Sequence, residues 1–314
     1  MQQYYQKQQL PQKFQIPSKI HKNLQGHKGA IYSVKFNSNG EYIMSCSQDR
    51  NINLWNPHKG TLIKTFTGAH NYDIYDLCIS QDNYKFGSAG GDKVAFLWDV
   101  STGNILRKFE GHISKINTIV YSDDESVLIT GSYDCKICFW DLKSHSYKPI
   151  DTIKICKDSV SKIVVDSHQV LVSSIDGKIR TFDIRMGILT TDDMKHPVHS
   201  FSLSNDKKTY AASCLDSNIR LLDRENGFVL NSYTGHNTSN YQSNVIFSFD
   251  DRFLIQGSED GSIFYYDILS QEPKNTTKNH FKAVVALSLS PLRDTLVSGS
   301  YDYNISVWKI QESE

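Results

Sequence analysis

The sequence predicts an all-β fold, a seven-bladed β-propeller, from one repeated pair of residues and the motifs that flank it. Successive repeat Asp residues are 40–44 residues apart, which is the length of one four-stranded blade. Gly-His pairs precede three of the repeats, and Trp-Asp pairs end two of them. In each repeat an Asp is followed six residues later by a large apolar residue: Asp49 and Trp55, Asp92 and Trp98, Asp134 and Trp140, Asp176 and Phe182, Asp216 and Leu222, Asp260 and Tyr266, Asp302 and Trp308.

The two ends of the chain divide it into a tail, one propeller and a short C-terminal end. Residues 1–18 are rich in Gln and lack an apolar period, so we expect a flexible tail. The propeller is expected over residues 19–310, with residues 311–314 as the C-terminal end. Residues 20–24 resemble an outermost strand, and residues 305–310 resemble a third strand that no fourth strand follows. The N-terminal strand is therefore predicted to complete the last blade and close the ring.

Each unit shows the same order of strands. In the first unit, strands are predicted over residues 31–36, 42–46 and 52–55, with a polar turn after the first and the Asp turn after the second. The third residue after the repeat Asp is Ile in six units and Ala95 in the other. Such strands pack on both sides against neighbouring blades, which explains why apolar residues do not alternate strictly.

Composition excludes several classes of function. Lys and Arg together equal Asp and Glu, so the net charge is zero and no global field attracts nucleic acid or a membrane. No run of about 18 apolar residues and no signal-peptide pattern occurs, so we expect a soluble, non-secreted protein. Cys135 and Cys138 have the spacing of a metal or redox pair, but on a strand they would face opposite sides. We expect no metal and no cofactor, because nucleotide-binding and zinc motifs are missing from the sequence.

A hydroxyl and an indole occur together in four units. The residue four positions before the Asp is Ser or Thr in the units that have Trp, and Val172, Ala212 or Gln256 in the others. A buried indole N–H needs an acceptor, and a hydroxyl can accept it while donating to a His that faces the Asp. We expect four structural hydrogen-bond tetrads: His27, Ser45, Asp49 and Trp55; His70, Ser88, Asp92 and Trp98; His112, Thr130, Asp134 and Trp140; His280, Ser298, Asp302 and Trp308.

Ser, His and Asp together also suggest a hydrolase, but the pattern argues against one. The set occurs four times, its members fall at strand ends between blades, and no oxyanion-hole glycine motif accompanies it. We therefore expect no catalytic residues and no enzyme. Units 4 and 5 lack the Gly-His pair, so they are expected to be held by packing alone and to form the softer part of the ring.

Function is then expected on the rims of the ring. The loops that enter the first strand of each blade and the Asp turns open on one face. Exposed Tyr combines apolar area with a hydrogen-bonding tip, although packing against the next blade explains a Tyr almost as well. Residues 237–242 contain a two-residue insertion on this face. The candidate partner-binding residues are Tyr32, Gln48, Asp73, Tyr75, Lys115, Asn117, Tyr133, His199, Glu259 and Tyr301.

These motifs resemble those of the seven-bladed WD-repeat proteins over residues 19–310. Within them, Asn56-Pro57-His58-Lys59-Gly60 and Asp183-Ile184-Arg185-Met186-Gly187 are similar to segments of the mitogen-activated protein kinase organiser family. The segments over residues 90–99, 219–223 and 258–261 share this similarity. The Gln-rich tail is not part of the pattern.

The resemblance implies a non-enzymatic scaffold, with kinase-cascade components or spliceosomal proteins as partners. It also implies a cytoplasmic and nuclear location and a monomer within larger complexes; we expect neither a membrane nor direct nucleic-acid contact. A substrate receptor of a cullin-type ubiquitin ligase is the alternative, because Asp176, Phe182, Asp183 and Arg185, with Asp134, Trp140, Asp141 and Lys143, resemble an adaptor-docking box. Most WD repeats supply much of that box. The sequence does not identify the partner, the face it binds or the role of the tail.

Overall fold

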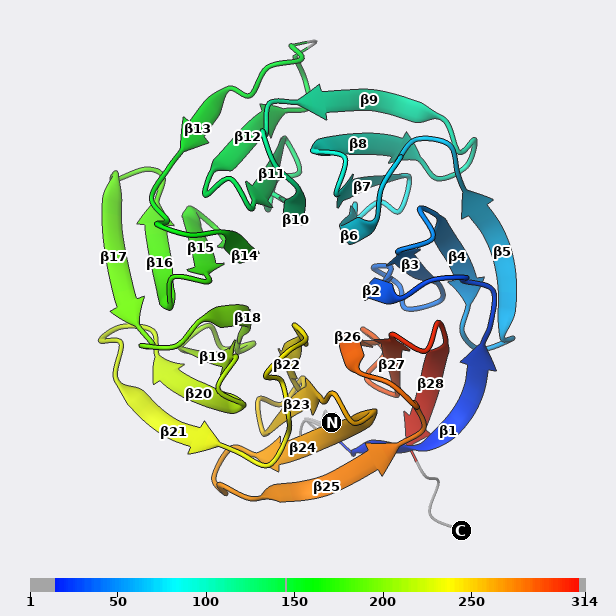
Figure 1. Cartoon of the computed structure of the whole chain (residues 1–314), viewed down its shortest axis with the longest axis vertical. Coiled ribbons are helices and arrows are strands. Elements are labelled where there is room, and N and C mark those ends of the chain that lie inside the picture. The colour runs from blue at the N-terminus through cyan, green and yellow to red at the C-terminus, as the bar shows by residue number, and fades with distance from the viewer. Residues whose placement is uncertain (1–14, 145, 311–314) are drawn as a thin grey trace, which may run out of the picture.

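The computed structural model describes residues 15–144 and 146–310, and every element in it is a β-strand. Seven four-stranded antiparallel sheets surround a central channel as the blades of a propeller (Figure 1). The predicted all-β, seven-bladed fold is confirmed. In the described part of the chain there is no helix long and apolar enough to cross a membrane.

The first three blades follow one another along the chain, each from its innermost to its outermost strand. Blade 1 contains β2 (Ile31–Phe36), β3 (Ile43–Ser47), β4 (Ile52–Asn56) and β5 (Thr61–Phe66). Blade 2 contains β6 (Ile74–Ile79), β7 (Lys85–Gly90), β8 (Val94–Asp99) and β9 (Ile105–Glu110). Blade 3 contains β10 (Ile116–Tyr121), β11 (Val127–Ser132), β12 (Ile137–Asp141) and β13 (Asp151–Ile153).

The next three blades repeat this order. Blade 4 contains β14 (Val160–Asp166), β15 (Gln169–Ser174), β16 (Lys178–Asp183) and β17 (Ile188–Asp193). Blade 5 contains β18 (Val198–Leu203), β19 (Thr209–Cys214), β20 (Asn218–Asp223) and β21 (Val229–Tyr233). Blade 6 contains β22 (Val245–Phe247), β23 (Phe253–Gly257), β24 (Ser262–Asp267) and β25 (Pro273–Lys278).

Blade 7 closes the ring with a strand from the other end of the chain. It contains β26 (Val284–Leu289), β27 (Thr295–Ser300) and β28 (Ile305–Ile310), and its outermost strand is β1 (Pro17–Leu24). β1 pairs antiparallel with β28, as predicted, and Leu24 lies opposite Ile305 (Figure 1). Pro17 and Ser18 were expected in the flexible tail, but they belong to this strand. The expected tail residues 1–14 and the C-terminal residues 311–314 lie outside the described part of the chain.

The core consists of wedges between neighbouring blades. One cluster joins Ile31, Val34 and Trp55 of blade 1 to Val297 and Val307 of blade 7. Burial on both sides of each sheet explains the near-continuous apolar strands of the sequence. Each blade thus stabilises its two neighbours, so that closing the ring removes the last open side.

Each Asp turn contains one residue in the left-handed backbone region, directly after the repeat Asp. The φ angles of these residues lie between 58° and 86° at Arg50, Lys93, Cys135, Gly177, Ser217, Gly261 and Tyr303. Cys135 is therefore a turn residue and does not share a strand with Cys138, so the expectation that both lie on one strand is wrong. All six cysteines are free thiols.

Candidate functional site

The four units with Trp form hydrogen-bonded tetrads at one end of the sheets. In blade 1, the Trp55 indole N–H donates to Ser45 Oγ over 2.8 Å, and Ser45 Oγ lies 2.7 Å from His27 Nε2. The other ring nitrogen, Nδ1, lies 2.9 Å from Asp49 Oδ2. Burial alone would raise the pKa of the Asp49 carboxyl, but the hydrogen bonds from His27 and the Lys28 backbone hold it below its usual range.

The corresponding bonds join the predicted residues in blades 2, 3 and 7. Their lengths lie between 2.8 and 3.0 Å. The hydroxyls of the four tetrads are fully buried, at 0% exposure for Ser45, Ser88, Thr130 and Ser298. Because no substrate can reach a hydroxyl in that position, these sets are suited to joining strands and not to nucleophilic catalysis.

Blades 4 and 5 replace the missing His with an Arg. In blade 4, Arg180 Nη1 lies 3.0 Å from Asp176 Oδ1, and Nη2 lies 2.7 Å from Oδ2. In blade 5, Arg220 contacts Asp216 in the same way, at 3.2 and 2.6 Å. The expectation that these blades are held by packing alone is wrong, because a bidentate pair of this kind is strong and directional. The signal was present in the sequence as Arg four residues after the repeat Asp.

Blade 6 uses a third arrangement. Tyr266 occupies the Trp position, and its hydroxyl lies 2.9 Å from His236 Nδ1. Gln256 occupies the Ser position and is fully buried, and its amide N–H donates to the Ser243 carbonyl over 3.4 Å. The Tyr hydroxyl thus reaches the His directly and makes the bridging Ser unnecessary.

The face that carries the repeat His residues and the Asp turns, here called the upper face, contains a cavity at the mouth of the channel. The cavity has a volume of about 510 Å³. Seven of the ten candidate partner-binding residues line it: Tyr32, Tyr75, Lys115, Asn117, Tyr133, His199 and Tyr301. Gln48, Asp73 and Glu259 are not among its lining residues. Asp73 accepts a hydrogen bond from the Tyr32 hydroxyl, and Glu259 accepts bonds from the backbone of Asn240 and Tyr241.

Five Tyr residues form an aromatic arc around this mouth: Tyr241, Tyr301, Tyr32, Tyr75 and Tyr133. Ring centroids are 4.7 Å apart for the first pair, 5.7 Å for the second and 5.1 Å for the third. The Lys115 ammonium lies 5.3 Å from the Tyr75 ring and 5.2 Å from the Tyr133 ring, so it bridges the last two. The arc crosses from blade 6 to blade 3 and joins five blades along one edge.

The members of the arc differ in exposure. Tyr133 is 54% exposed and Tyr241 is 41% exposed, whereas Tyr32 packs between two other rings. Burial raises the pKa of Tyr32, so its hydroxyl stays protonated and donates to Asp73. Both interpretations of these Tyr residues therefore apply, because the inner rings pack across blades and the outer rings face solvent. Tyr241 lies in the inserted loop over residues 237–242.

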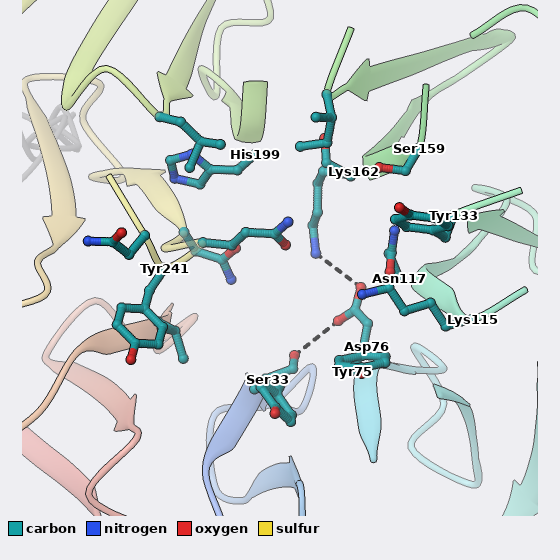
Figure 2. Close-up of a pocket in the computed structure, with 18 of the residues that line it drawn as sticks. Ser33, Tyr75, Asp76, Lys115, Asn117, Tyr133, Ser159, Lys162, His199 and Tyr241 are labelled. Atoms are coloured by element: carbon teal, nitrogen blue, oxygen red, sulfur yellow. Dashed lines mark hydrogen bonds and ion pairs between the residues drawn. The ribbon is translucent and has the colours of Figure 1, made fainter. Parts of the chain in front are cut away.

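Below the arc, an ion pair crosses the channel. Lys162 of β14 reaches from blade 4 to Asp76 of β6, with Nζ 3.0 Å from Oδ2 (Figure 2). Ser33 and Thr118 donate hydrogen bonds to the same carboxylate over 3.0 and 3.1 Å. Burial alone would raise the pKa of Asp76, but Lys162 and Lys35 lower it to about 2. No motif in the sequence marks this pair, because both residues lie within ordinary innermost strands.

His199 forms part of the cavity wall between blades 5 and 6 (Figure 2). Its Nε2 lies 2.9 Å from the Ser243 carbonyl oxygen, so this nitrogen carries the proton. Nδ1 is buried and has no hydrogen-bond partner among the described residues. Burial lowers the pKa of His199 to about 4, and the ring is neutral near pH 7.

Exposed apolar side chains lie outside the mouth on the same face. Phe281, Ile113 and Tyr72 are 90%, 69% and 62% exposed. Phe281 and Ile113 directly follow the tetrad residues His280 and His112, and their backbone N–H groups donate to the tetrad carboxylates of Asp302 and Asp134. The described residues contain no cluster of three or more His, Cys, Asp or Glu side chains that could hold a metal ion.

Comparison with known proteins relates the chain to one repeat family. The family model described as "WD domain, G-beta repeat" matches residues 18–56, 60–99, 103–141, 227–267 and 271–309. The chain is 32% identical to "WD repeat domain-containing protein 83 homolog" of Dictyostelium discoideum over 93% of its own length and 98% of the relative. It is 38% identical to "WD repeat domain-containing protein 83" of Rattus norvegicus over 82% of this chain and 82% of the relative. It is 35% identical to the protein of the same name from Xenopus tropicalis over 95% of this chain and 95% of the relative.

The family model leaves out residues 142–226, which include blade 4 and the first three strands of blade 5. These are the two blades in which Arg180 and Arg220 replace the His. The gap in the family match thus coincides with a change in how the Asp turn is held, while the blade architecture continues through it.

Proposed function

Because this chain belongs to the WD40 repeat family, we propose that it is a non-enzymatic scaffold that gathers other proteins on its upper face. The aromatic arc around the channel mouth carries this proposal. Tyr rings with free edges, a cavity and exposed apolar loops form the kind of surface on which a few residues supply most of the binding energy. The lower face, formed by the other two sets of loops, has no comparable aromatic cluster among the described residues.

The proposed partners are components of a mitogen-activated protein kinase cascade, or proteins of pre-mRNA splicing complexes. The resemblance to the kinase organiser family supports both groups, because it implies either kinase-cascade components or spliceosomal proteins as partners. The scaffold would then act in the cytoplasm and the nucleus. Zero net charge fits a protein partner better than a direct RNA contact.

Proximity labelling with mass spectrometry tests both the role and the face. The wild type is compared with the double variant Tyr133→Ala and Phe281→Ala, which removes two exposed rings from the upper face. The matched control is Phe228→Ala with Met186→Ala, because both side chains are 70% exposed and lie in the connections between third and fourth strands, at the opposite face. Thermal melts establish that all three proteins are folded.

The proposal expects the upper-face variant to lose its main partners and the control to retain them. Loss of kinases would assign the signalling role, and loss of splicing proteins would assign the splicing role. Identical partner sets for the wild type and the upper-face variant would contradict the choice of face, and an empty partner set for the wild type would contradict the scaffold itself.

The alternative role, a substrate receptor of a cullin-type ubiquitin ligase, rests on the docking-box residues. Arg185 is exposed in the connection between β16 and β17, and Asp183 accepts hydrogen bonds from the backbone of Arg185 and Met186. Arg185→Ala leaves those backbone bonds in place and removes only the exposed guanidinium. Loss of an adaptor protein from the labelled set in this variant would favour the ligase role.

A further inference from the structure

The channel below the aromatic arc holds two ammonium groups for one carboxylate. Lys162 Nζ lies 3.0 Å from Asp76 Oδ2, and Lys35 Nζ lies 3.9 Å from Asp76 Oδ1. The Asp76 side chain is 3% exposed and that of Lys162 is 16% exposed, so this charge is weakly screened by solvent. One positive charge in the channel therefore lacks a counter-charge among the described residues that form these ion pairs.

The cavity above it carries a further cation. Lys115 lines the cavity between the rings of Tyr75 and Tyr133, and it forms no ion pair with a described carboxylate. Asp158 is the other acidic residue in the cavity wall; it is exposed and accepts a hydrogen bond from the Ser159 backbone N–H. The charged residues that line the cavity are thus Lys115, Lys162, Asp76 and Asp158, and Lys35 beside Asp76 adds one positive charge, although the protein as a whole is neutral.

The apolar side chains outside the mouth fit an extended polypeptide segment. Phe281 and Ile113 are exposed beside blades 7 and 3, and the outer rings Tyr133 and Tyr241 stand closer to the cavity. An extended segment has side chains that alternate in direction. Such a segment can therefore point one residue into the cavity while its neighbours cover the apolar rim.

We propose that the channel mouth takes an extended segment of a partner protein and places an Asp or Glu carboxylate against the ammonium groups of Lys162 and Lys115. The apolar rim receives the flanking side chains of the segment. A single carboxylate supplies one negative charge, which matches the one positive charge of the channel that has no counter-charge. A phosphate carries a larger negative charge and therefore matches the channel less well. This inference rests on the proposed scaffold role and specifies the chemistry of its partner.

An immobilised peptide library tests the chemistry without a known partner. Random nonapeptides with the central position fixed as Glu, Gln or phosphoserine are incubated with the purified full chain, and retained protein is measured. The wild type should be retained about tenfold more by the Glu set than by the Gln set, as expected for hydrogen bonds to a charged group. Lys115→Gln and Lys162→Met should each reduce this ratio severalfold.

Two controls separate charge from folding. Lys148→Gln changes an exposed lysine in the β12–β13 connection, a third-to-fourth-strand connection at the face opposite the cavity, and should leave the ratio unchanged. The Lys115 side chain contacts the rings of Tyr75 and Tyr133 and takes no part in the Lys162–Asp76 ion pair. Lys115→Gln therefore keeps that buried pair intact and tests the proposal even if Lys162→Met fails to fold.

Each outcome decides the proposal. Equal retention by the Glu and Gln sets would overturn it, and stronger retention by the phosphoserine set would replace the carboxylate with a phosphate. If the ratio is flat but the partners from proximity labelling still depend on the upper face, the scaffold role stands and only the acidic chemistry fails. If neither peptides nor partners bind, the scaffold role fails as well.

Discussion

Arg180 holds both carboxylate oxygens of Asp176 in the blade where the sequence lacks a His. The two N–O distances are 3.0 and 2.7 Å, and the Arg180 and Asp176 side chains are 5% and 9% exposed. The pair closes the Asp turn from within its own sheet, whereas the tetrads close it with a His from the preceding loop. Hydrogen bonds from Arg180 and the Lys157 backbone lower the pKa of Asp176 against the opposing effect of burial.

Removing this guanidinium should destabilise the propeller strongly. Arg180→Ala leaves a buried carboxylate without its partner, a loss of about 3 kcal/mol in the free energy of unfolding. Urea unfolding of the full chain measures it. Arg185→Ala, at an exposed site five residues away, should change stability by less than about 0.5 kcal/mol. A similar small effect of Arg180→Ala would show that packing alone suffices.

Removing one tetrad hydroxyl should also be costly. Ser45→Ala leaves the Trp55 indole N–H and His27 Nε2 without partners, for a loss of about 2 kcal/mol. Ser45→Thr should be milder, because Thr130 occupies the same position in blade 3 with bonds of 2.8 and 2.9 Å. Thermal unfolding measures the loss of stability in both variants. If Ser45→Thr lost as much stability as Ser45→Ala, the added methyl group of Thr would be as damaging in blade 1 as the missing hydroxyl.

Acid should weaken the fold before the Asp carboxyls titrate. Burial lowers the pKa of both His199 and His236 to about 4, whereas an unfolded His has a pKa of about 6.5. The unfolded chain therefore binds more protons between these values, so stability is complete above pH 6.5 and is lost as the pH falls toward 4. Each His should contribute a loss of about 1–2 kcal/mol at pH 5.

The measurement is urea unfolding at pH 7.5 and pH 5.0. His236→Gln should show a smaller difference between the two pH values than the wild type, even though it is less stable at both. The carboxyls of Asp49, Asp134 and Asp302 have pKa values below their usual range, so their contribution is lost only at lower pH. An unchanged pH difference would mean that His236 is not the group that titrates.

The closing strand should contribute to the stability of the whole ring. Leu24 is 1% exposed between β1 and the core shared by blades 7 and 1, so Leu24→Ala should cost about 2–5 kcal/mol. Leu62→Ala, at 45% exposure on the outer strand β5, is the control and should cost far less.

Truncation tests the same strand from its beginning. Removal of residues 1–15, which stops before the Ile16 side chain that packs against the core of blades 6 and 7, should leave the melting temperature nearly unchanged. Extending the deletion through Pro17 removes the carbonyl that accepts a 2.9 Å hydrogen bond from the buried Tyr265 hydroxyl. This longer deletion should lower the melting temperature measurably. A large effect of the shorter deletion would show that earlier residues contribute to the fold.

The repeat geometry was predictable because each tetrad is set by local spacing. His27 and Asp49 are 22 residues apart, as are His70 and Asp92, and one blade architecture fixes that spacing. The Arg180 pair was predictable in principle, since Asp176 and Arg180 lie in one turn and one strand.

The centre of the channel was not predictable in this way. Lys162 and Asp76 are 86 residues apart and meet only because the ring places blade 4 across the channel from blade 2. Neither residue interrupts the pattern of its strand, and no periodic signal marks their contact. The aromatic arc was partly visible as Tyr residues at equivalent positions, but the sequence did not show which rings pack inward and which remain exposed.

The ring closure has a consequence for the order of events during synthesis. Ser306 of β28 donates a hydrogen bond to the Asn23 side chain of β1, and 283 residues of chain separate the two. β1 therefore leaves the ribosome long before its partner strand exists. At about 5–20 residues per second, the first strand waits on the order of 15–60 seconds with both edges unpaired. Blade 7 therefore assembles from the oldest and the youngest parts of the nascent chain, and a chaperone that shields the first strand would favour correct closure over pairing with another molecule.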